Sequence, residues 1–333
     1  MRVPLMPIPP GIKVAYQAPE APGEADLAFI QQLGVEYVVF STRAPSAGPE
    51  HYASRVALYQ QAGIRVFGVV NSSVHNQDAI VLGLEGRDAK IEEYKRHIRA
   101  LGQAGIPYTT YAHMANGIWS SEPLAGRGGA LARSFDPARG VKGFTSAGRV
   151  YEGALTHGRV YSQQELWDNF EYFIKQVAPV AEEAGVRIGI HPDDPPLDGL
   201  GGIPRCIFSS FEGYRQALEI ADSPNVGICL CVGCWVEGGP RMGKSVEETI
   251  RYFGERDRLF KVHLRNVDRP LPAFTETFLD NGYYSMAGVV RAMHEVGIYG
   301  IVIPDHIPAM GDNPRIGSAF SIGYIKGLVE QVK

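Results

Sequence analysis

Short runs of apolar and β-branched residues recur along the chain, and segments with helical periodicity separate them. Such nearly continuous runs are typical of strands that are buried on both faces of a parallel sheet. The pattern predicts eight strands, within residues 12–16, 35–40, 64–70, 108–111, 186–190, 226–232, 259–264 and 300–303.

Between the predicted strands, apolar residues return at steps of three and four positions. One such stripe runs over residues 91–101 and another over 166–177, and each indicates a helix with one buried face. A serine followed three residues later by a glutamate is a capping signal. It predicts helix starts at Ser162, Ser209 and Ser245.

The alternation of strands and helices favours a parallel sheet. Eight units in 333 residues fit a (β/α)₈ barrel, the TIM-barrel fold, as a single domain over residues 1–333. A doubly wound open sheet is the alternative. That fold usually shows a glycine-rich turn after its first strand, and residues 12–20 contain no G-x-G-x-x-G.

Residues 115–161 stand apart because they contain nine glycines and no sustained period. We expect a long loop after the fourth strand, inserted at the catalytic face of the barrel. The segment carries a net positive charge. A lid over an anionic substrate, a surface excursion and a dimer contact remain open as its role.

Composition narrows the function classes. A hydrophobic content of 45% with 20% charged residues argues against disorder. The net charge of −4 offers no footprint for nucleic acid, and no apolar run is long enough for a membrane span. Four cysteines are too few for a disulfide scaffold, and no secretory signal is visible. We expect a cytoplasmic protein without nucleic-acid or membrane partners.

The candidate chemistry lies at the ends of the last four predicted strands. His191, Cys231, His263 and Asp305 occupy corresponding points there. Each alone is ordinary: a strand-end histidine is often structural, a cysteine a small filler and an aspartate a helix cap. A barrel, however, directs all four at one place on its axis, and all are ligands for a divalent metal.

Cys231 and Cys234 also form a C-x-x-C pair, which in redox proteins lies at the start of a helix. The sequence predicts no helix directly after Cys231, so we favour the metal ligand. His306 beside Asp305 is a candidate proton carrier. Arg265 is a candidate fork for a substrate carboxylate, or a strand-end salt bridge.

These strand-end motifs resemble those of the mannonate dehydratase family. The resemblance covers most of the chain and is strongest from about residue 170 onward. The most specific match is His191-Pro-Asp-Asp-Pro-Pro196, which is similar to the family's H-P-D-D-P-P, followed by Gly202-Ile-Pro-Arg205, which is similar to G-L-x-R. Three shorter matches are Cys231-Val-Gly-Cys234 to C-T-G-S, His263-Leu-Arg265 to H-L-R and Pro304-Asp-His306 to P-D-H. Two further matches are Gly323-Tyr-Ile-Lys-Gly-Leu328 to G-x-x-K-G-L, and residues 129–136 to another family segment.

The resemblance implies a xylose-isomerase-like barrel that dehydrates D-mannonate to 2-keto-3-deoxy-D-gluconate with Mn²⁺ or Fe²⁺. It implies that the metal ligands are His191, Cys231, His263 and Asp305. His306 and Arg265 are then the expected catalytic residues. Substrate contacts are expected from Asp193, Arg205, Asn266 and His113.

The chain departs from the family pattern in parts of the expected substrate shell. Ile303 stands where the family has Arg, and Ile307 where it has Gly. Residues 110–113, beginning with Thr110, replace an N-F-M-P segment, and residues 16–18 replace W-Y-G. The substrate is therefore D-mannonate or a related sugar acid. A metal-dependent sugar isomerase or epimerase and a non-catalytic sugar-binding protein are the alternatives, and homo-oligomer formation is left open.

Overall fold

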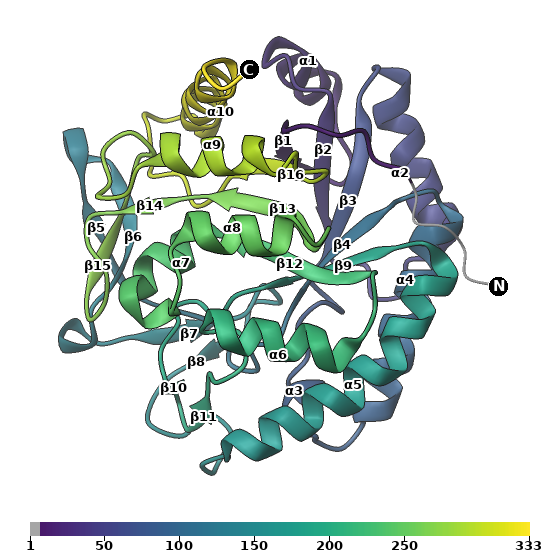
Figure 1. Cartoon of the computed structure of the whole chain (residues 1–333), viewed down its shortest axis with the longest axis vertical. Helices are drawn as coiled ribbons and strands as arrows, with labels where there is room; N and C mark the ends of the chain where they lie inside the picture. Colours follow the sequence, from purple (N-terminus) through teal and green to yellow (C-terminus); the bar gives the residue numbers. More distant parts are fainter. Residues whose placement is uncertain (1–6) are drawn as a thin grey trace.

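A computed structural model describes residues 7–333 of the chain. Its core is a closed barrel of parallel strands, and consecutive barrel strands are joined by connections that pack helices on the outside (Figure 1). The strands follow the order β1-β16-β13-β12-β9-β4-β3-β2 around the barrel. Their bounds are Lys13–Ala18 (β1), Tyr37–Thr42 (β2), Arg65–Asn71 (β3), Tyr108–Ala112 (β4), Arg187–His191 (β9), Val226–Cys231 (β12), Leu259–Leu264 (β13) and Ile301–Pro304 (β16).

This arrangement confirms the predicted (β/α)₈ barrel and each of the eight predicted strands, with bounds that agree to within two residues. The main helical layer comprises α1 (Glu24–Gln32), α2 (Pro49–Gln61), α3 (Asp78–Leu82), α4 (Arg87–Gln103), α5 (Gln163–Ala184), α6 (Phe211–Ala221), α7 (Val232–Gly238), α8 (Val246–Gly254), α9 (Met286–Glu295) and α10 (Pro314–Glu330). No helix within residues 7–333 combines the length and apolar character needed to cross a membrane.

Two of the three predicted helix caps are confirmed. Ser162 and Ser245 each accept a hydrogen bond from the backbone N–H three residues on, and the glutamate there reaches back. The prediction at Ser209 is wrong by one residue, because Ser210 caps α6. The Ser209 hydroxyl instead donates to Asp193 Oδ2 at 2.9 Å.

The segment 115–161 follows β4 as predicted, but the expectation of a loop without regular structure is wrong. It forms antiparallel strands that join strands from the connection after β13 in one additional sheet, ordered β14-β15-β6-β5-β7-β8. These strands are β5 (Ile118–Ala125), β6 (Leu131–Phe135), β7 (Lys142–Phe144), β8 (Val150–Tyr151), β14 (Asn266–Val267) and β15 (Phe274–Thr277), with 3₁₀ turns at Arg127–Gly129 and Pro137–Arg139.

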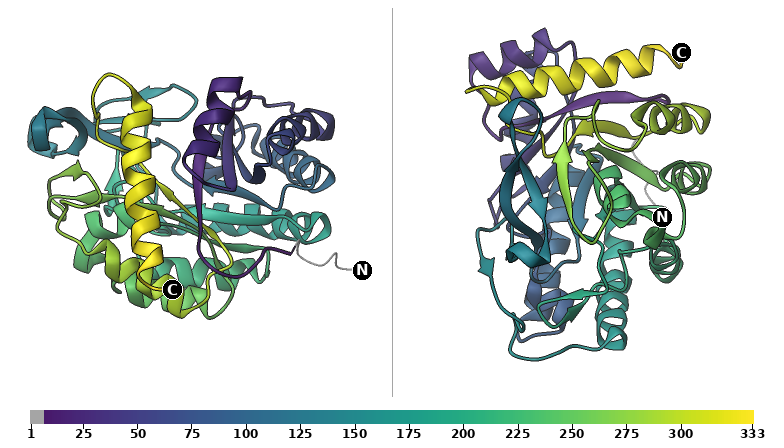
Figure 2. Two further views of the ribbon diagram at one scale, coloured as in Figure 1. Left: turned by 90° about the horizontal axis from the view of Figure 1, so that it is seen from above. Right: turned by 90° about the vertical axis from the view of Figure 1, so that its left-hand side faces the viewer.

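The additional sheet lies beyond the carboxyl ends of β12 and β13 (Figure 1; Figure 2, right). A short hairpin of β10 (Gly199–Leu200) and β11 (Ile203–Pro204) and a 3₁₀ turn at Gly239–Met242 complete the connections. The first and last helices of the chain, α1 and α10, lie beside each other (Figure 2, left). The first strand, β1, pairs with the last, β16, and this pairing closes the barrel.

Side chains alternate between the two faces of the barrel strands, except at register shifts such as that between β12 and β13, where Phe260 joins the interior cluster. Outward residues such as Val262 belong to the large core between strands and helices. A separate buried cluster fills the lower barrel interior with residues from six strands: Ala15, Val39, Phe67, Tyr108, Phe260, Ile301 and Ile303. The polar residues of the candidate site therefore lie above an apolar floor.

Candidate metal centre and active site

Four neighbouring strands bring His191, Cys231, His263 and Asp305 together. His191 and Cys231 end β9 and β12, His263 lies near the end of β13, and Asp305 follows β16. Asp305 Oδ2 is 3.6 Å from Cys231 Sγ and 3.7 Å from His263 Nδ1. The potential ligand atoms of these three residues all lie within 4.8 Å of one another. The potential ligand atoms of His191, Cys231 and Cys234 likewise lie within 4.8 Å of one another.

The two histidine rings are oriented as metal ligands require. His263 Nδ1 is buried and has no hydrogen-bond partner within residues 7–333, while Nε2 lies 3.7 Å from Cys229 Sγ. His191 Nδ1 is 2.7 Å from the carbonyl oxygen of Pro192, which leaves Nε2 available. Fixing one ring nitrogen in this way directs the other at a metal. Two imidazoles, a thiolate and a carboxylate fit a borderline divalent ion.

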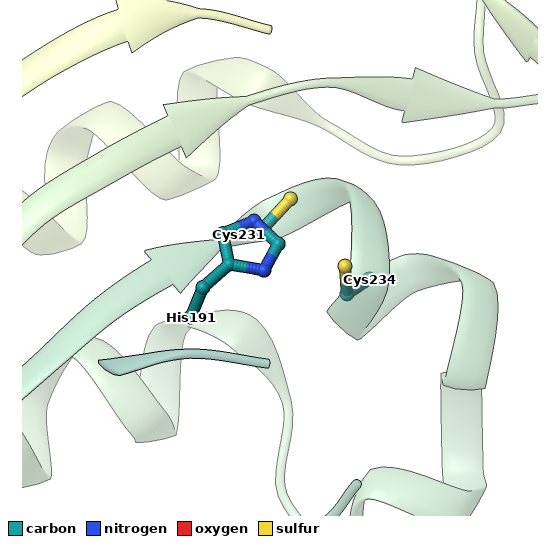
Figure 3. Close-up of side chains that lie close together, drawn as sticks. All are labelled: His191, Cys231 and Cys234. Atoms are coloured by element: carbon teal, nitrogen blue, oxygen red, sulfur yellow. The ribbon is translucent and has the colours of Figure 1, made fainter. Parts of the chain in front are cut away.

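Cys231 is held in the form that binds metals. Burial favours the neutral thiol, but a hydrogen bond from Cys234 and the charge of Arg265 outweigh burial and hold the pKa of Cys231 well below its ordinary value. Figure 3 shows His191 at the end of β9, Cys231 at the end of β12 and Cys234 in the helical turn that follows. The sequence prediction that no helix follows Cys231 is wrong, because α7 begins at Val232.

A network of buried charges adjoins the cluster. Two arginines, Arg133 from β6 and Arg265 after β13, share the carboxylates of Asp194, Glu237 and Glu276. Arg265 Nη2 is 2.9 Å from Asp194 Oδ2 and 3.1 Å from Glu237 Oε1, and its Nη1 is 3.0 Å from Glu276 Oε1. Arg133 Nη1 is 2.9 Å from the same Glu276 oxygen. The additional sheet is thus fastened to the barrel beside the candidate site.

This network does not fit the expectation that Arg265 forks onto a substrate carboxylate. Its side chain is 0% exposed, and its terminal nitrogens already contact four carboxylates, including that of Asp305 at 3.6 Å. Arg265 Nη2 also donates to Cys234 Sγ at 3.2 Å, and Nη1 contacts His306 Nδ1. The salt-bridge alternative describes Arg265 better, and its guanidinium holds neighbouring side chains in place.

His306 has the features of a proton carrier. Its backbone lies in the left-handed region (φ 44°), which non-glycine residues adopt rarely and often at functional sites. Nδ1 is 2.9 Å from Glu276 Oε1, and the side chain is 32% exposed. Burial alone would lower the pKa of His306, but Asp305 and Glu276 outweigh it and raise the pKa to about 9. The imidazole is therefore charged at neutral pH and can donate a proton.

Two of the expected substrate contacts serve the loop after β9. Asp193 is buried, and its carboxylate accepts a hydrogen bond from the Ser209 hydroxyl. The same carboxylate lies 3.8 Å from Arg205 Nη1. Arg205 is also buried and donates to the Asp194 carbonyl oxygen, to Asn116 Oδ1 and to the Gly117 carbonyl oxygen. These contacts indicate that Asp193 and Arg205 fix the tight loop after β9.

The other two expected contacts also make structural interactions. His113 packs edge-on against Phe170 of α5, with 5.5 Å between ring centroids, and Tyr111 Oη lies 2.9 Å from its Nδ1. It therefore faces the helical layer, and the structure does not bring it to the metal cluster. Asn266 donates to the carbonyl oxygens of Leu279 and Tyr284 and anchors the connection after β14.

Sequence reasoning missed Arg133, Glu237 and Glu276 as parts of the site. Arg133 and Glu276 lie on β6 and β15, which pair with each other through Phe135 and Phe274. That pairing joins segments that are far apart in the chain, so the local sequence pattern does not predict it. Glu237 carried a weak signal, because it is a charged residue in an otherwise apolar and glycine-rich stretch, 232–239.

Comparison with known proteins supports the resemblance over nearly the whole chain. The family model described as D-mannonate dehydratase matches residues 20–139 and 149–333. Mannonate dehydratase 1 of Halalkalibacterium halodurans is 32% identical over 341 residues, which cover 92% of this chain and 92% of that protein. Mannonate dehydratase 2 of the same organism is 32% identical over 288 residues, covering 79% and 82%.

Solved structures agree with the sequence relatives. The crystal structure of mannonate dehydratase from Streptococcus suis serotype 2 superposes with a TM-score of 0.82 at 27% identity, over 97% of this chain and 95% of that one. An L-ribulose 3-epimerase shares the barrel, with a TM-score of 0.62 at 12% identity and coverage of 97% and 96%. The latter likeness concerns the fold alone. The chain belongs to the D-mannonate dehydratase family, whose named members are hydro-lyases.

Proposed function

We propose that the protein is a metal-dependent sugar-acid dehydratase that removes water from D-mannonate or a close relative and yields a 2-keto-3-deoxy acid. Membership of the D-mannonate dehydratase family supports the reaction. The observation that carries the proposal is the convergence of Cys231, His263 and Asp305 around the unpartnered His263 Nδ1, with His191 beside Cys231. A sugar isomerase of the same fold remains an outcome of the test below.

The family is generally metal-dependent, and the donor atoms of this chain fit a divalent ion. We assign His191, Cys231, His263 and Asp305 as its ligands, with Mn²⁺ or Fe²⁺ as the ion. The thiolate of Cys231 is a softer donor than Mn²⁺ prefers, so both ions belong in the test. When bound, the ion supplies Lewis acidity that makes the proton on C2 of the aldonate easier to remove.

His306 supplies the proton that the leaving hydroxyl on C3 needs. Elimination breaks the C2–H and C3–O bonds: a base takes the C2 proton, the departing hydroxyl takes a proton and leaves as water, and the resulting enol tautomerises to the 2-keto-3-deoxy acid. The charged imidazole beside Asp305 is placed to donate it. Glu276 Oε1 accepts a hydrogen bond from Nδ1 of the charged His306, and Arg265 Nη1 in turn holds that Glu276 oxygen at 3.0 Å, so both act as positioning residues.

The remaining parts of the proposal concern the setting of the enzyme. A small-molecule sugar acid is the partner that the site suits. We propose a cytoplasmic location, because four cysteines in 333 residues provide no disulfide scaffold of the kind typical of secreted domains. Homo-oligomer formation stays a prediction, to be measured by the mass of the protein in solution.

The test is a screen of aldonates with protein that has been stripped of metal and reloaded with Mn²⁺ or Fe²⁺. We expect 2-keto-3-deoxy acid from D-mannonate or a close relative, and no product after chelation. His306→Gln should lower kcat by about 10²–10⁴-fold, as loss of a general acid does, while the metal content stays unchanged. If the reloaded protein forms no keto acid from any aldonate, the proposed function is wrong.

A further inference from the structure

Lys261 in β13 faces the barrel interior beside the metal cluster. Register places Lys261 next to Cys229 of β12, and His263 next to Cys231. Val262, between them, belongs to the outer core under the helices. Because side chains alternate along a strand, Lys261 and His263 both point toward the barrel axis. Lys261 therefore lies one layer below the candidate metal ligands.

The ammonium group of Lys261 has no bonding partner in the described chain. The residue is 1% exposed, yet it forms no hydrogen bond or ion pair with any residue of 7–333. Burying a charged group without a partner is costly, so proteins rarely retain one without a reason. Cys229, Asp305 and Cys231 act on Lys261 only through longer-range electrostatics, so its N–H groups are free to donate hydrogen bonds to a bound ligand.

The other buried cations each form ion pairs or hydrogen bonds through their terminal nitrogens. Arg265 contacts four carboxylates, and Arg205 donates to the loops around Asn116 and Asp194. Lys13 donates to two backbone carbonyls at the other end of the barrel. Arg265 Nε is also without a hydrogen-bond partner, but the terminal nitrogens of Arg265 are paired, whereas the terminal nitrogen of Lys261 is not.

The surroundings of Lys261 place it at the candidate site. It is near enough to Cys229, Cys231 and Asp305 to interact electrostatically with each. Tyr108 and Phe260 belong to the apolar cluster that forms the floor of the barrel interior. On the adjacent strand β16, the apolar Ile303 lies in register with His263 and supplies no cation. An anion bound beside the metal ligands would therefore meet Lys261.

We propose that Lys261 binds the carboxylate of the sugar-acid substrate, the role that the enclosed Arg265 is unable to fill. The inference rests on the proposed function and deepens it. An ammonium donates charge-assisted hydrogen bonds to a carboxylate. As the C2 proton leaves, negative charge spreads onto that carboxylate, and a fixed cation stabilises the developing charge. Lys261 is then a specificity-determining residue that selects acids over neutral sugars.

The first experiment measures binding of D-mannonate by calorimetry in a His306→Gln background, where turnover is slowed. Lys261→Met removes the charge and keeps the length of the side chain, and Lys175→Met on the exposed face of α5 is the matched control. We expect Lys261→Met to weaken binding by at least about tenfold, the loss typical of a hydrogen bond to a charged group. Metal content should stay at the level of the control.

A second measurement compares D-mannonate with its neutral amide. We expect the parent protein to prefer the acid and Lys261→Met to lose most of that preference. Equal affinity of Lys261→Met and the control for D-mannonate overturns the inference. The inference is also overturned if Lys261→Met loses metal and its metal-loaded fraction binds D-mannonate with the affinity of the control. If Lys261→Met and Lys261→Gln both fail to fold, equal affinity of the parent protein for acid and amide overturns it. A parent protein that converts no aldonate contradicts the proposed function instead.

Discussion

At the scale of single residues, each donor of the candidate metal centre depends on its neighbours. Cys231 is kept as a thiolate by Cys234 and Arg265, and Cys229 occupies the second nitrogen of His263. Such supporting contacts orient a ligand and make its lone pair available. These contacts therefore hold the side chains of the candidate metal centre in place.

The same reasoning predicts the effect of removing one ligand. Cys231→Ala should abolish stoichiometric metal binding, because the remaining imidazoles and carboxylate lose the central thiolate that both ligand groups share. Cys206→Ala is the control, since Cys206 lies outside both groups and is only partly buried. Elemental analysis after dialysis measures the outcome. Equal metal content in the two variants would exclude Cys231 as a ligand.

At the scale of elements, the barrel strands were predictable and the additional sheet was not. Strands such as Leu259–Leu264 are buried along their whole length, so their composition alone indicates them. β6 and β15 are short, and Phe135 pairs with Phe274 across a long stretch of sequence. Local pattern contains no information on such pairing. Arg133 and Glu276 could therefore not be assigned to the site from sequence.

Helix α7 was missed for a related reason. Its residues, Val232–Gly238, include two glycines and β-branched valines, which have low helix propensity. The surrounding packing holds it in place: a Cβ on Gly233 would lie 1.9 Å from Arg265 Nε. Glycine is required there because the guanidinium passes directly against the helix backbone.

This close approach gives a prediction for the element. Gly233→Ala should displace Arg265, lower stability by about 1–3 kcal/mol through overpacking and reduce kcat. Gly323→Ala in α10 is the matched control, since no heavy atom lies within 4 Å of its Cβ. That substitution should stabilise by about 0.5–1 kcal/mol, as alanine does in a helix. Denaturant unfolding of both variants checks the contrast, and equal shifts would contradict it.

At the scale of the whole molecule, buried charges connect the additional sheet to the barrel. Arg133 of β6 contacts Asp194, Glu237 and Glu276, and its Nη2 donates to the Trp119 carbonyl oxygen at 2.8 Å. Removal of one partner from such a group leaves buried charges unpaired, which is strongly destabilising. The sheet and the site should therefore lose order together.

We expect Arg133→Met to lower the free energy of unfolding by about 3–5 kcal/mol, the cost typical of breaking a buried ion pair. Hydrogen exchange should rise in both β5–β6 and the turn after β12. Arg127→Met, which breaks an exposed pair with Asp280, should change stability little. If Arg133→Met is as stable as Arg127→Met, the buried charges around Arg133 do not hold the additional sheet on the barrel.

The central claim is that the metal-loaded protein eliminates water from an aldonate. It is tested most directly by following D-mannonate with the reloaded protein by NMR and observing C2 and C3 of the sugar acid over time. We predict loss of the C3 hydroxyl and growth of a C3 methylene next to a ketone, as in 2-keto-3-deoxy-D-gluconate. Appearance of a C2 epimer or an isomer that retains the C3 hydroxyl would contradict the account.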